Sequence, residues 1–219
     1  DFKFKNENTA VNFFKNSNEN IKQIVNEFYY SNITKKFSTK TDINSIVKKK
    51  YNIHLTLPSN IKVNKSNGDI TWLSRLTIEK DQNGKHEIQQ GLIIYEYPYS
   101  HPSQFNLDHQ IFFRDSIYKN HILGKKDSTF MESRKDELGN FSHNAVLNKN
   151  GEYIVEIAGL WRVVNDKMGG PFVSISRLNP SKTKIITIEG YVYAPNFRKG
   201  DFIRELKAMI YSLKWDYSQ

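Results

Sequence analysis

Apolar residues near the amino terminus recur at helical spacing. Ile21, Ile24, Val25 and Phe28 stand three or four positions apart, and many of the residues around them are Asn or Ser. This period places the four apolar residues on one side of a helix, so we expect a helix from Thr9 to about Tyr30.

A polar stretch from Ser31 to Lys40 follows and shows no apolar period. Such a stretch is typical of a linker. Thr41 is a suitable N-cap for a short helix that carries Ile43, Ile46 and Val47 on one side. A boundary between two parts of the chain is therefore predicted near residue 40.

The next segments alternate between apolar and polar residues, which indicates β-strands. Tyr51–Pro58 alternates strictly and stops at a proline. Two more strands are expected at 70–78 and 90–99, joined by the polar turn Asp81-Gln82-Asn83-Gly84.

Three β-rich segments occupy the carboxy-terminal half, at 152–164, 172–177 and 184–193. The turn sequences Met168-Gly169-Gly170-Pro171 and Asn179-Pro180-Ser181-Lys182 separate them. Short Gly- and Pro-containing connections join neighbouring antiparallel strands, so these segments are expected to form an antiparallel meander.

Helices are predicted at 106–122, with Leu107, Ile111 and Tyr118 in its periodic set, and at 199–213. The element order is strands, helix, strands, helix. This order predicts an α+β domain, with an antiparallel sheet and helices packed mainly on one of its faces.

Composition narrows the choice of function class. The chain has 219 residues, a net charge of +9 and no cysteine, and 38% of its residues are hydrophobic. It contains no run of about 18 apolar residues that could cross a membrane. The lysines are scattered and accompany no nucleic-acid-binding motif, so we expect no nucleic-acid partner. No cysteine or histidine pattern suggests a metal, and no cofactor motif is present.

Two carboxylates are the main candidates for chemistry. Glu156 and Glu189 fall on predicted strands of one sheet, together with Arg162 and Arg177. Paired carboxylates can perform acid and base catalysis. Carboxylates in a sheet also form ion pairs with arginines on neighbouring strands, and this structural role is the favoured interpretation.

Aromatic residues lie close to these charges in the sequence. Trp161, Tyr191 and Tyr193 could form a flat platform for a sugar or another ligand, or they could be core residues with a polar edge. Together with Arg162, Arg177 and Glu189 they make this region the best candidate binding site.

Two short motifs, Asp115-Ser116-Ile117 and Asp127-Ser128-Thr129, resemble the O-glycosylation acceptor of Bacteroidota envelope proteins. Ser116 and Ser128 are therefore candidate glycosylation sites. The first motif falls on the helix predicted at 106–122, where Asp115 and Ser116 would also serve as the polar side.

A longer series of residues resembles a family of Bacteroidota lipoproteins known as domain of unknown function 4837. The resemblance covers nearly the whole chain. The family has no established activity, so the resemblance implies no catalytic residue in this sequence. The order of elements is also similar to the α+β domain of PsbP-type and Mog1-type proteins. The family resemblance rests on Phe113-Arg114-Asp115-Ser116-Ile117, Asn150-Gly151-Glu152-Tyr153, Gly159-Leu160-Trp161, Met168-Gly169-Gly170-Pro171-Phe172 and Glu189-Gly190-Tyr191-Val192-Tyr193-Ala194-Pro195.

The resemblance implies an exported protein held at the outer membrane by an amino-terminal lipid anchor that lies outside this chain. Residues 1–40 would then be a helix and linker that end a preceding domain, and residues 41–219 would be the carboxy-terminal α+β domain. The leading hypothesis is a non-enzymatic envelope lipoprotein that binds another envelope protein through the aromatic and charged region. The alternative is a glycan- or small-ligand-binding protein, or a hydrolase that uses Glu156 and Glu189.

Overall fold

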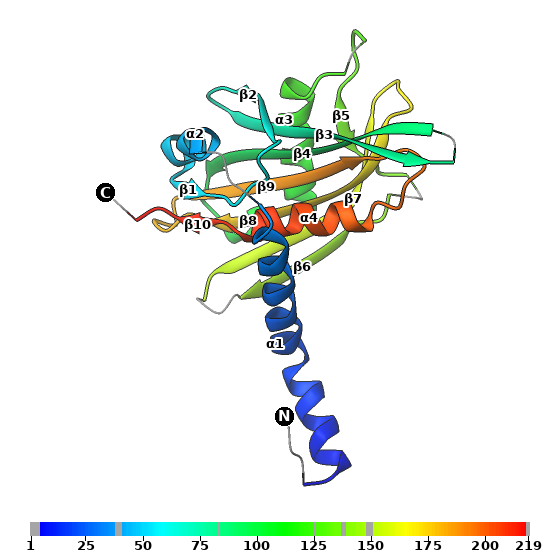
Figure 1. The fold of residues 1–219 in the computed structure, drawn as a ribbon. Helices are drawn as coiled ribbons and strands as arrows, with labels where there is room; N and C mark the ends of the chain where they lie inside the picture. Colours follow the sequence, from blue (N-terminus) through cyan, green and yellow to red (C-terminus); the bar gives the residue numbers. More distant parts are fainter. Residues whose placement is uncertain are drawn as a thin grey trace.

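An eight-stranded antiparallel sheet forms the centre of the molecule (Figure 1). The structure is a computed structural model that describes residues 5–37, 41–82, 84–124, 126–136, 139–147 and 151–217, without the side chains of 10–23 and 41. Three residues named in the sequence predictions are affected. The side chain of Ile21 and the whole of Asn83 and Asn150 lie outside the described residues. The strand order is β2-β3-β4-β9-β8-β7-β5, and β6 also pairs with β7.

The strands follow the predicted pattern closely in the long hairpin and in the meander. The hairpin strands are β3 (Ile70–Asp81) and β4 (Gly84–Pro98), and β4 pairs with β9 (Lys184–Tyr193). The predicted meander is β7, β8 and β9, because β8 pairs with both of its neighbours in the chain. The remaining strands are β1 (Ile53–His54), β2 (Lys62–Ser66), β5 (Met131–Ser133), β6 (Ser142–Leu147), β7 (Tyr153–Val163), β8 (Gly169–Leu178) and β10 (Lys214–Trp215).

Alternation along β9 divides the core into two layers. Ile186, Ile188 and Val192 pack on one face of the sheet, whereas Ile185 and Tyr191 pack on the other. Successive side chains of a strand point to opposite faces, so each face has its own apolar cluster. A sheet of this kind needs a cover on both sides.

Helices α2 (Thr41–Tyr51) and α4 (Gly200–Tyr211) cover the first face. Leu206, Met209 and Ile210 of α4 recur at helical spacing and are buried against the sheet. The end of the chain is held because Trp215 Nε1 donates a hydrogen bond of 2.8 Å to Glu152 Oε1. We call this side the α4 face.

The second face is covered by α3 (Leu107–His121), which follows the short 3-10 helix η1 (Pro102–Phe105). Figure 1 shows α3 behind the sheet and α4 in front of it. We call this side the α3 face. The α+β class and the antiparallel sheet are thus confirmed, with one helix on the second face.

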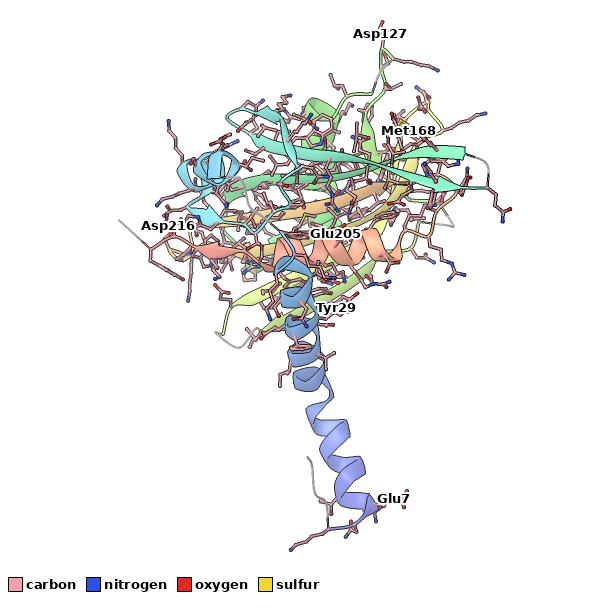
Figure 2. The ribbon with its side chains drawn as sticks, in the orientation of Figure 1. Glu7, Tyr29, Asp127, Met168, Glu205 and Asp216 are labelled. Atoms are coloured by element: carbon pink, nitrogen blue, oxygen red, sulfur yellow. The ribbon has the colours of Figure 1, made fainter. Side chains whose placement is uncertain are left out.

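Helix α1 (Glu7–Thr34) projects from the domain and meets it only near its carboxyl end (Figure 1). The ring of Tyr30 stacks on Tyr211 of α4, with 5.3 Å between centroids. Ile24, Val25 and Phe28, three of the four apolar residues of the predicted helix, are exposed. Figure 2 shows Tyr29 on this part of α1, close to where the helix meets the domain. Within the described residues, no helix combines the length and apolar character that a membrane crossing requires.

Three local predictions need correction. The segment 51–58 is not one strand, because α2 runs to Tyr51 and β1 contains only Ile53 and His54. Its alternation reflects burial of Leu55 and Leu57 in the core. Helix α1 continues into the predicted linker, where Ser31 Oγ and Thr34 Oγ1 bond to backbone carbonyls of the preceding turn. The turn expected at 168–171 comes earlier, since Gly169, Gly170 and Pro171 begin β8.

Candidate functional site

Helix α3 carries a charged residue on the side that faces the sheet. Gln110, Ile111, Arg114 and Tyr118 are its buried residues, and their spacing of one helical turn places them along one stripe. An arginine in such a stripe needs a partner, because an unpaired charge is costly to remove from water.

The partner of Arg114 is Glu189 on β9. Arg114 Nε donates to Glu189 Oε2 and Arg114 Nη2 donates to Glu189 Oε1, both at 2.6 Å. The Glu189 side chain is 0% exposed. The guanidinium carbon also lies 4.3 Å from the ring centroid of Tyr118 and 4.1 Å from that of Phe172. This is a buried, bidentate ion pair with aromatic neighbours.

The network continues outward through Asp115 and Ser133. Arg114 Nη1 donates to Ser133 Oγ at 2.8 Å and to Asp115 Oδ1 at 3.0 Å. Ser133 donates to Asp115 Oδ1 from both its backbone nitrogen and its hydroxyl, at 2.8 and 2.7 Å. Lys135 Nζ lies 2.9 Å from Asp115 Oδ2. A chain of alternating charges therefore leads from the centre of the sheet to the surface.

Burial and charge pairing shift the pKa values within this network. Burial raises the pKa of Glu189, and the Arg114 guanidinium offsets this only in part. Burial alone would lower the pKa of Arg114, but Glu189 outweighs it and raises that pKa. Burial also acts to raise the pKa of Asp115, yet Arg114, Ser133 and Lys135 together lower it. Asp115 is therefore held as a carboxylate.

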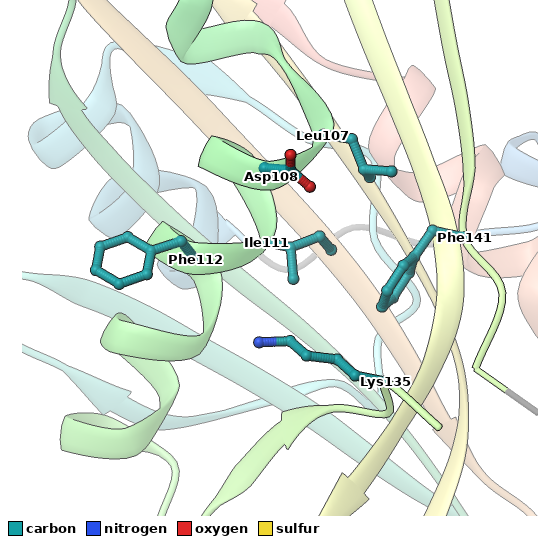
Figure 3. Close-up of a pocket in the computed structure, with 6 residues that line it drawn as sticks. All are labelled: Leu107, Asp108, Ile111, Phe112, Lys135 and Phe141. Atoms are coloured by element: carbon teal, nitrogen blue, oxygen red, sulfur yellow. The ribbon is translucent and has the colours of Figure 1, made fainter. Parts of the chain in front are cut away.

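A surface pocket lies where this network reaches the outside. Its volume is about 250 Å³, and Lys135 is one of its lining residues. Figure 3 shows the pocket between α3 and the segment that carries Phe141, with Lys135 beside them. Phe112 stands at its margin and is 73% exposed. The complete lining is Leu107, Asp108, Ile111, Phe112, Lys135 and Phe141.

The predicted aromatic residues do gather in one place, on the α3 face. The Trp161 ring lies 5.6 Å from that of Tyr191 and 6.5 Å from that of Tyr193. Tyr191 Oη accepts hydrogen bonds from Trp72 Nε1 at 3.0 Å and from Gln89 Nε2 at 3.3 Å. Trp161 and Tyr191 are each 3% exposed, so their rings are inside the domain.

A glycine makes room for this cluster. Gly91 lies directly opposite Tyr191 in the sheet. A Cβ atom at position 91 would come within 2.1 Å of the Tyr191 ring. The ring therefore lies over the backbone of β4, and Trp72, which the sequence reasoning did not single out, completes its surroundings.

The two predicted arginines are not part of this group. Arg162 pairs with Glu132 on β5, with Nη2 2.7 Å from Glu132 Oε1, and Arg177 Nη1 lies 3.7 Å from Glu152 Oε2. Arg162 lies between Trp161 and Val163, which point to the α3 face, and Arg177 lies next to Leu178, which does the same. Since successive side chains of a strand point to opposite faces, both arginines point to the α4 face. The six predicted residues thus divide between the two faces.

The expected ladder between Glu156, Glu189, Arg162 and Arg177 is also not formed. Glu156 lies opposite Ile175 and Glu189 opposite Ser174, so the two carboxylates are on opposite faces of the sheet. Helices supply their partners. Glu156 accepts from Lys207 Nζ at 2.6 Å and from Tyr211 Oη at 2.9 Å, both on α4.

Comparison with known proteins places the chain in a family. The model of a domain of unknown function, DUF4837, matches residues 40–212. The chain belongs to the DUF4837 family. No curated protein matches it. A structure of an uncharacterized protein from Rhizobium leguminosarum is similar at 10% identity over 57% of this chain and 92% of that chain, with a TM-score of 0.22.

The DUF4837 match includes both partners of the buried ion pair, Arg114 and Glu189. It also includes Ser116 and Ser128, the candidate glycosylation sites, and both are exposed. The carboxylate of Asp115, which precedes Ser116, has a structural partner in Ser133. In the described part of the DUF4837 protein, no three acidic or histidine side chains gather as a metal site would require.

Asp115 gives the DUF4837 domain a pH-dependent contribution to stability. We expect Asp115→Asn to lower the free energy of unfolding by about 2 kcal/mol at pH 7, because a carboxylate bonded to Arg114 and Ser133 is lost. The folded pKa of Asp115 is lowered, so this contribution is present above the unfolded value of about 3.9 and is lost as the pH falls further. Urea unfolding at pH 7 and pH 3 should show a smaller gap between wild type and variant at pH 3 than at pH 7. An equal gap at both pH values would contradict this assignment.

Proposed function

We propose that this DUF4837 protein is a non-enzymatic accessory lipoprotein of the cell envelope whose α+β domain binds another envelope protein. The observation that carries the proposal is the pocket beside α3, with exposed Phe112 at its margin. Large aromatic residues exposed beside a surface hollow are typical of protein interfaces, whose cores are enriched in aromatic side chains.

The pocket is slightly smaller than a typical small-molecule site and is large enough for one side chain of a partner protein. Small-molecule sites usually enclose about 300–1,000 Å³. A volume of about 250 Å³ suits a single apolar side chain that a partner inserts against Ile111 and Phe141. Asp108 and Lys135 at the same pocket offer one negative and one positive group for the polar rim of an interface.

The charge network supports this use because its ion pair with Asp115 positions Lys135, which is one of the lining residues of the pocket. Lys135 lies against Asp115, and Asp115 accepts two hydrogen bonds from Ser133 of β5. A wall that is ordered before binding loses less conformational freedom when the partner arrives. Asp115 and Ser133 would thus contribute to binding indirectly, by positioning Lys135, without contacting the partner.

The two predicted carboxylates do not support the glycan-binding or hydrolase alternative. Glu156 and Glu189 are separated by the sheet, and each is bonded to basic side chains. Neither lines the pocket. The place in the envelope rests on the family resemblance, and fractionation of cells with detection of the lipidated protein tests it directly.

Replacement of Phe112 by serine should separate binding from folding. Because Phe112 is exposed, we expect Phe112→Ser to change the free energy of unfolding by no more than about 0.5 kcal/mol. Recovery of the partner after mild crosslinking in native cells should fall at least about tenfold, the loss expected for an interface anchor. The matched control is Leu123→Ser, which removes a similarly exposed apolar side chain just beyond α3. Equal recovery with both variants would contradict the proposed surface.

A further inference from the structure

The outer edge of the β3–β4 hairpin is open over half of β3. Strand β2 pairs with β3 only from Thr71 to Ser74, while β4 pairs with β3 as far as Asp81. In the described part of the chain, no strand therefore pairs with residues 75–81 on the side away from β4. Figure 1 shows this hairpin projecting beyond the helices.

The open segment carries two exposed apolar side chains. Leu76 is 60% exposed and Ile78 is 64% exposed. They share the face of β3 that carries Trp72, since the side chains alternate along the strand. Proteins usually protect an exposed edge of this kind, because its unpaired backbone groups accept another strand.

We infer that a second copy of this chain occupies the edge, with the two β3 segments pairing antiparallel about a two-fold axis at Ile78. This inference is independent of the proposed function, which concerns the pocket beside α3. Because β2 already occupies the position opposite Ser74, an added strand has seven residues available, from Arg75 to Asp81. The same seven residues of a second copy fill that length.

The residues that meet in this register are complementary. Ile78 faces Ile78 of the second copy, and Leu76 faces the aliphatic stem and ammonium of Lys80. On the other face of the sheet, Arg75 is opposite Asp81 and Thr77 is opposite Glu79. Arg75 is already bonded to Gln90 and Glu205, and Asp81 to His86, so these pairs add no new ion pair and the apolar contacts carry the register. No two like charges are opposed, and the pairing is self-complementary as a two-fold interface requires. Pairing one residue off this register would place the apolar side chains on opposite faces.

A short edge of this size predicts a weak, reversible dimer. Stable interfaces usually bury about 800 Å² on each partner, and seven residues of one strand contribute less than that. Sedimentation of the full chain should therefore show an average mass that rises with concentration from 25.7 kDa toward twice that value. A mass that stays at the monomer value to millimolar concentration would overturn the inference.

Substitution at the axis tests which surface is used. Ile78→Lys should weaken dimerization more than about tenfold, because two apolar side chains are lost and two like charges face each other. Leu147→Lys is the matched control, since Leu147 is 65% exposed on the other end strand, β6. Equal weakening by both variants, or by neither, would contradict pairing through β3.

The register itself is testable because the chain contains no cysteine. Directly opposed residues of antiparallel strands have Cα atoms about 4.5–5.5 Å apart, which suits a disulfide. Ile78→Cys should therefore form a disulfide-linked dimer on mild oxidation. Leu76→Cys should not, because its two copies would be about 13 Å apart along the strands. A mixture of Leu76→Cys and Lys80→Cys should again crosslink.

A control variant is needed to distinguish crosslinking within the dimer from crosslinking during random collisions of monomers. Leu147→Cys provides the rate for an exposed position outside the interface. A dimer yield for Ile78→Cys that only equals that of Leu147→Cys, or a higher yield for Leu76→Cys alone than for Ile78→Cys, would overturn the proposed pairing.

Discussion

Replacement of Arg114 by methionine is expected to lower the free energy of unfolding by about 3–5 kcal/mol at pH 7. Methionine keeps much of the side-chain length but leaves Glu189 buried without its bidentate partner. Asp115 and Ser133 also lose a donor. Urea unfolding followed by tryptophan fluorescence measures the loss.

A second substitution distinguishes the uncompensated charge from lost packing. In the Arg114→Met background, Glu189→Gln should restore about 1–3 kcal/mol at pH 7, because the amide does not carry the charge whose burial is costly. The pKa of Glu189 is raised in the folded protein and should rise further without Arg114. A raised carboxyl pKa stabilises the fold at low pH and less as the pH rises through it, so Arg114→Met alone should recover stability between pH 7 and about pH 4.5. If the double variant were no more stable than Arg114→Met at pH 7, Glu189 would not be the source of the loss.

Replacement of Trp161 by alanine is expected to cost about 3–5 kcal/mol of the free energy of unfolding. The indole is 3% exposed and packs at its edge against the ring of Tyr191. Truncation would leave a cavity beside Tyr191 and Tyr193 on the α3 face of the sheet, which these neighbouring rings cannot fill. Chemical unfolding of the purified domain is the measurement.

Arg162→Ala is the matched control because it changes the next residue of the same strand. The Arg162 side chain is 51% exposed and its ion pair with Glu132 lies at the surface, so we expect a loss of at most about 1 kcal/mol. A small effect of Trp161→Ala, combined with loss of partner binding by folded protein, would show instead that Trp161 serves an interface.

Much of the fold could be predicted from local patterns. The helices expected at 106–122 and 199–213 are α3 and α4, and the strand expected at 184–193 is β9. These elements carry long periodic sets of apolar residues, which identify helices and strands reliably. The segment 51–58 failed for the same physical reason, because alternation reports burial on one side and not the presence of a pairing strand.

The partners of the charged residues could not be predicted in the same way. Glu189 and Arg114 are 75 positions apart, and nothing in their local sequence connects them. The strand arginines Arg162 and Arg177 were closer in sequence to Glu189, but they project to the other face. Which face a strand residue occupies depends on the register between strands, which is a property of the whole sheet.

The pocket is likewise a product of tertiary structure. Its walls come from α3, from Lys135 after β5, and from Phe141 before β6. The one local signal for the pocket is Phe112, an apolar residue that stands directly before the family motif Phe113-Arg114-Asp115. Phe112 lies between Ile111 and Phe113, which both pack toward the core. Its exposure therefore becomes visible only when the orientation of α3 on the sheet is known.

The most direct test of the protein-binding account is site-specific photocrosslinking from position 112. A photoreactive phenylalanine analogue would replace Phe112 in the full-length protein, expressed in its native cells, and a second strain would carry it at Leu123. We expect a discrete crosslinked adduct with one other envelope protein from position 112 and none from position 123. No adduct from position 112, or the same adducts from both positions, would contradict the assignment of this pocket as the binding surface.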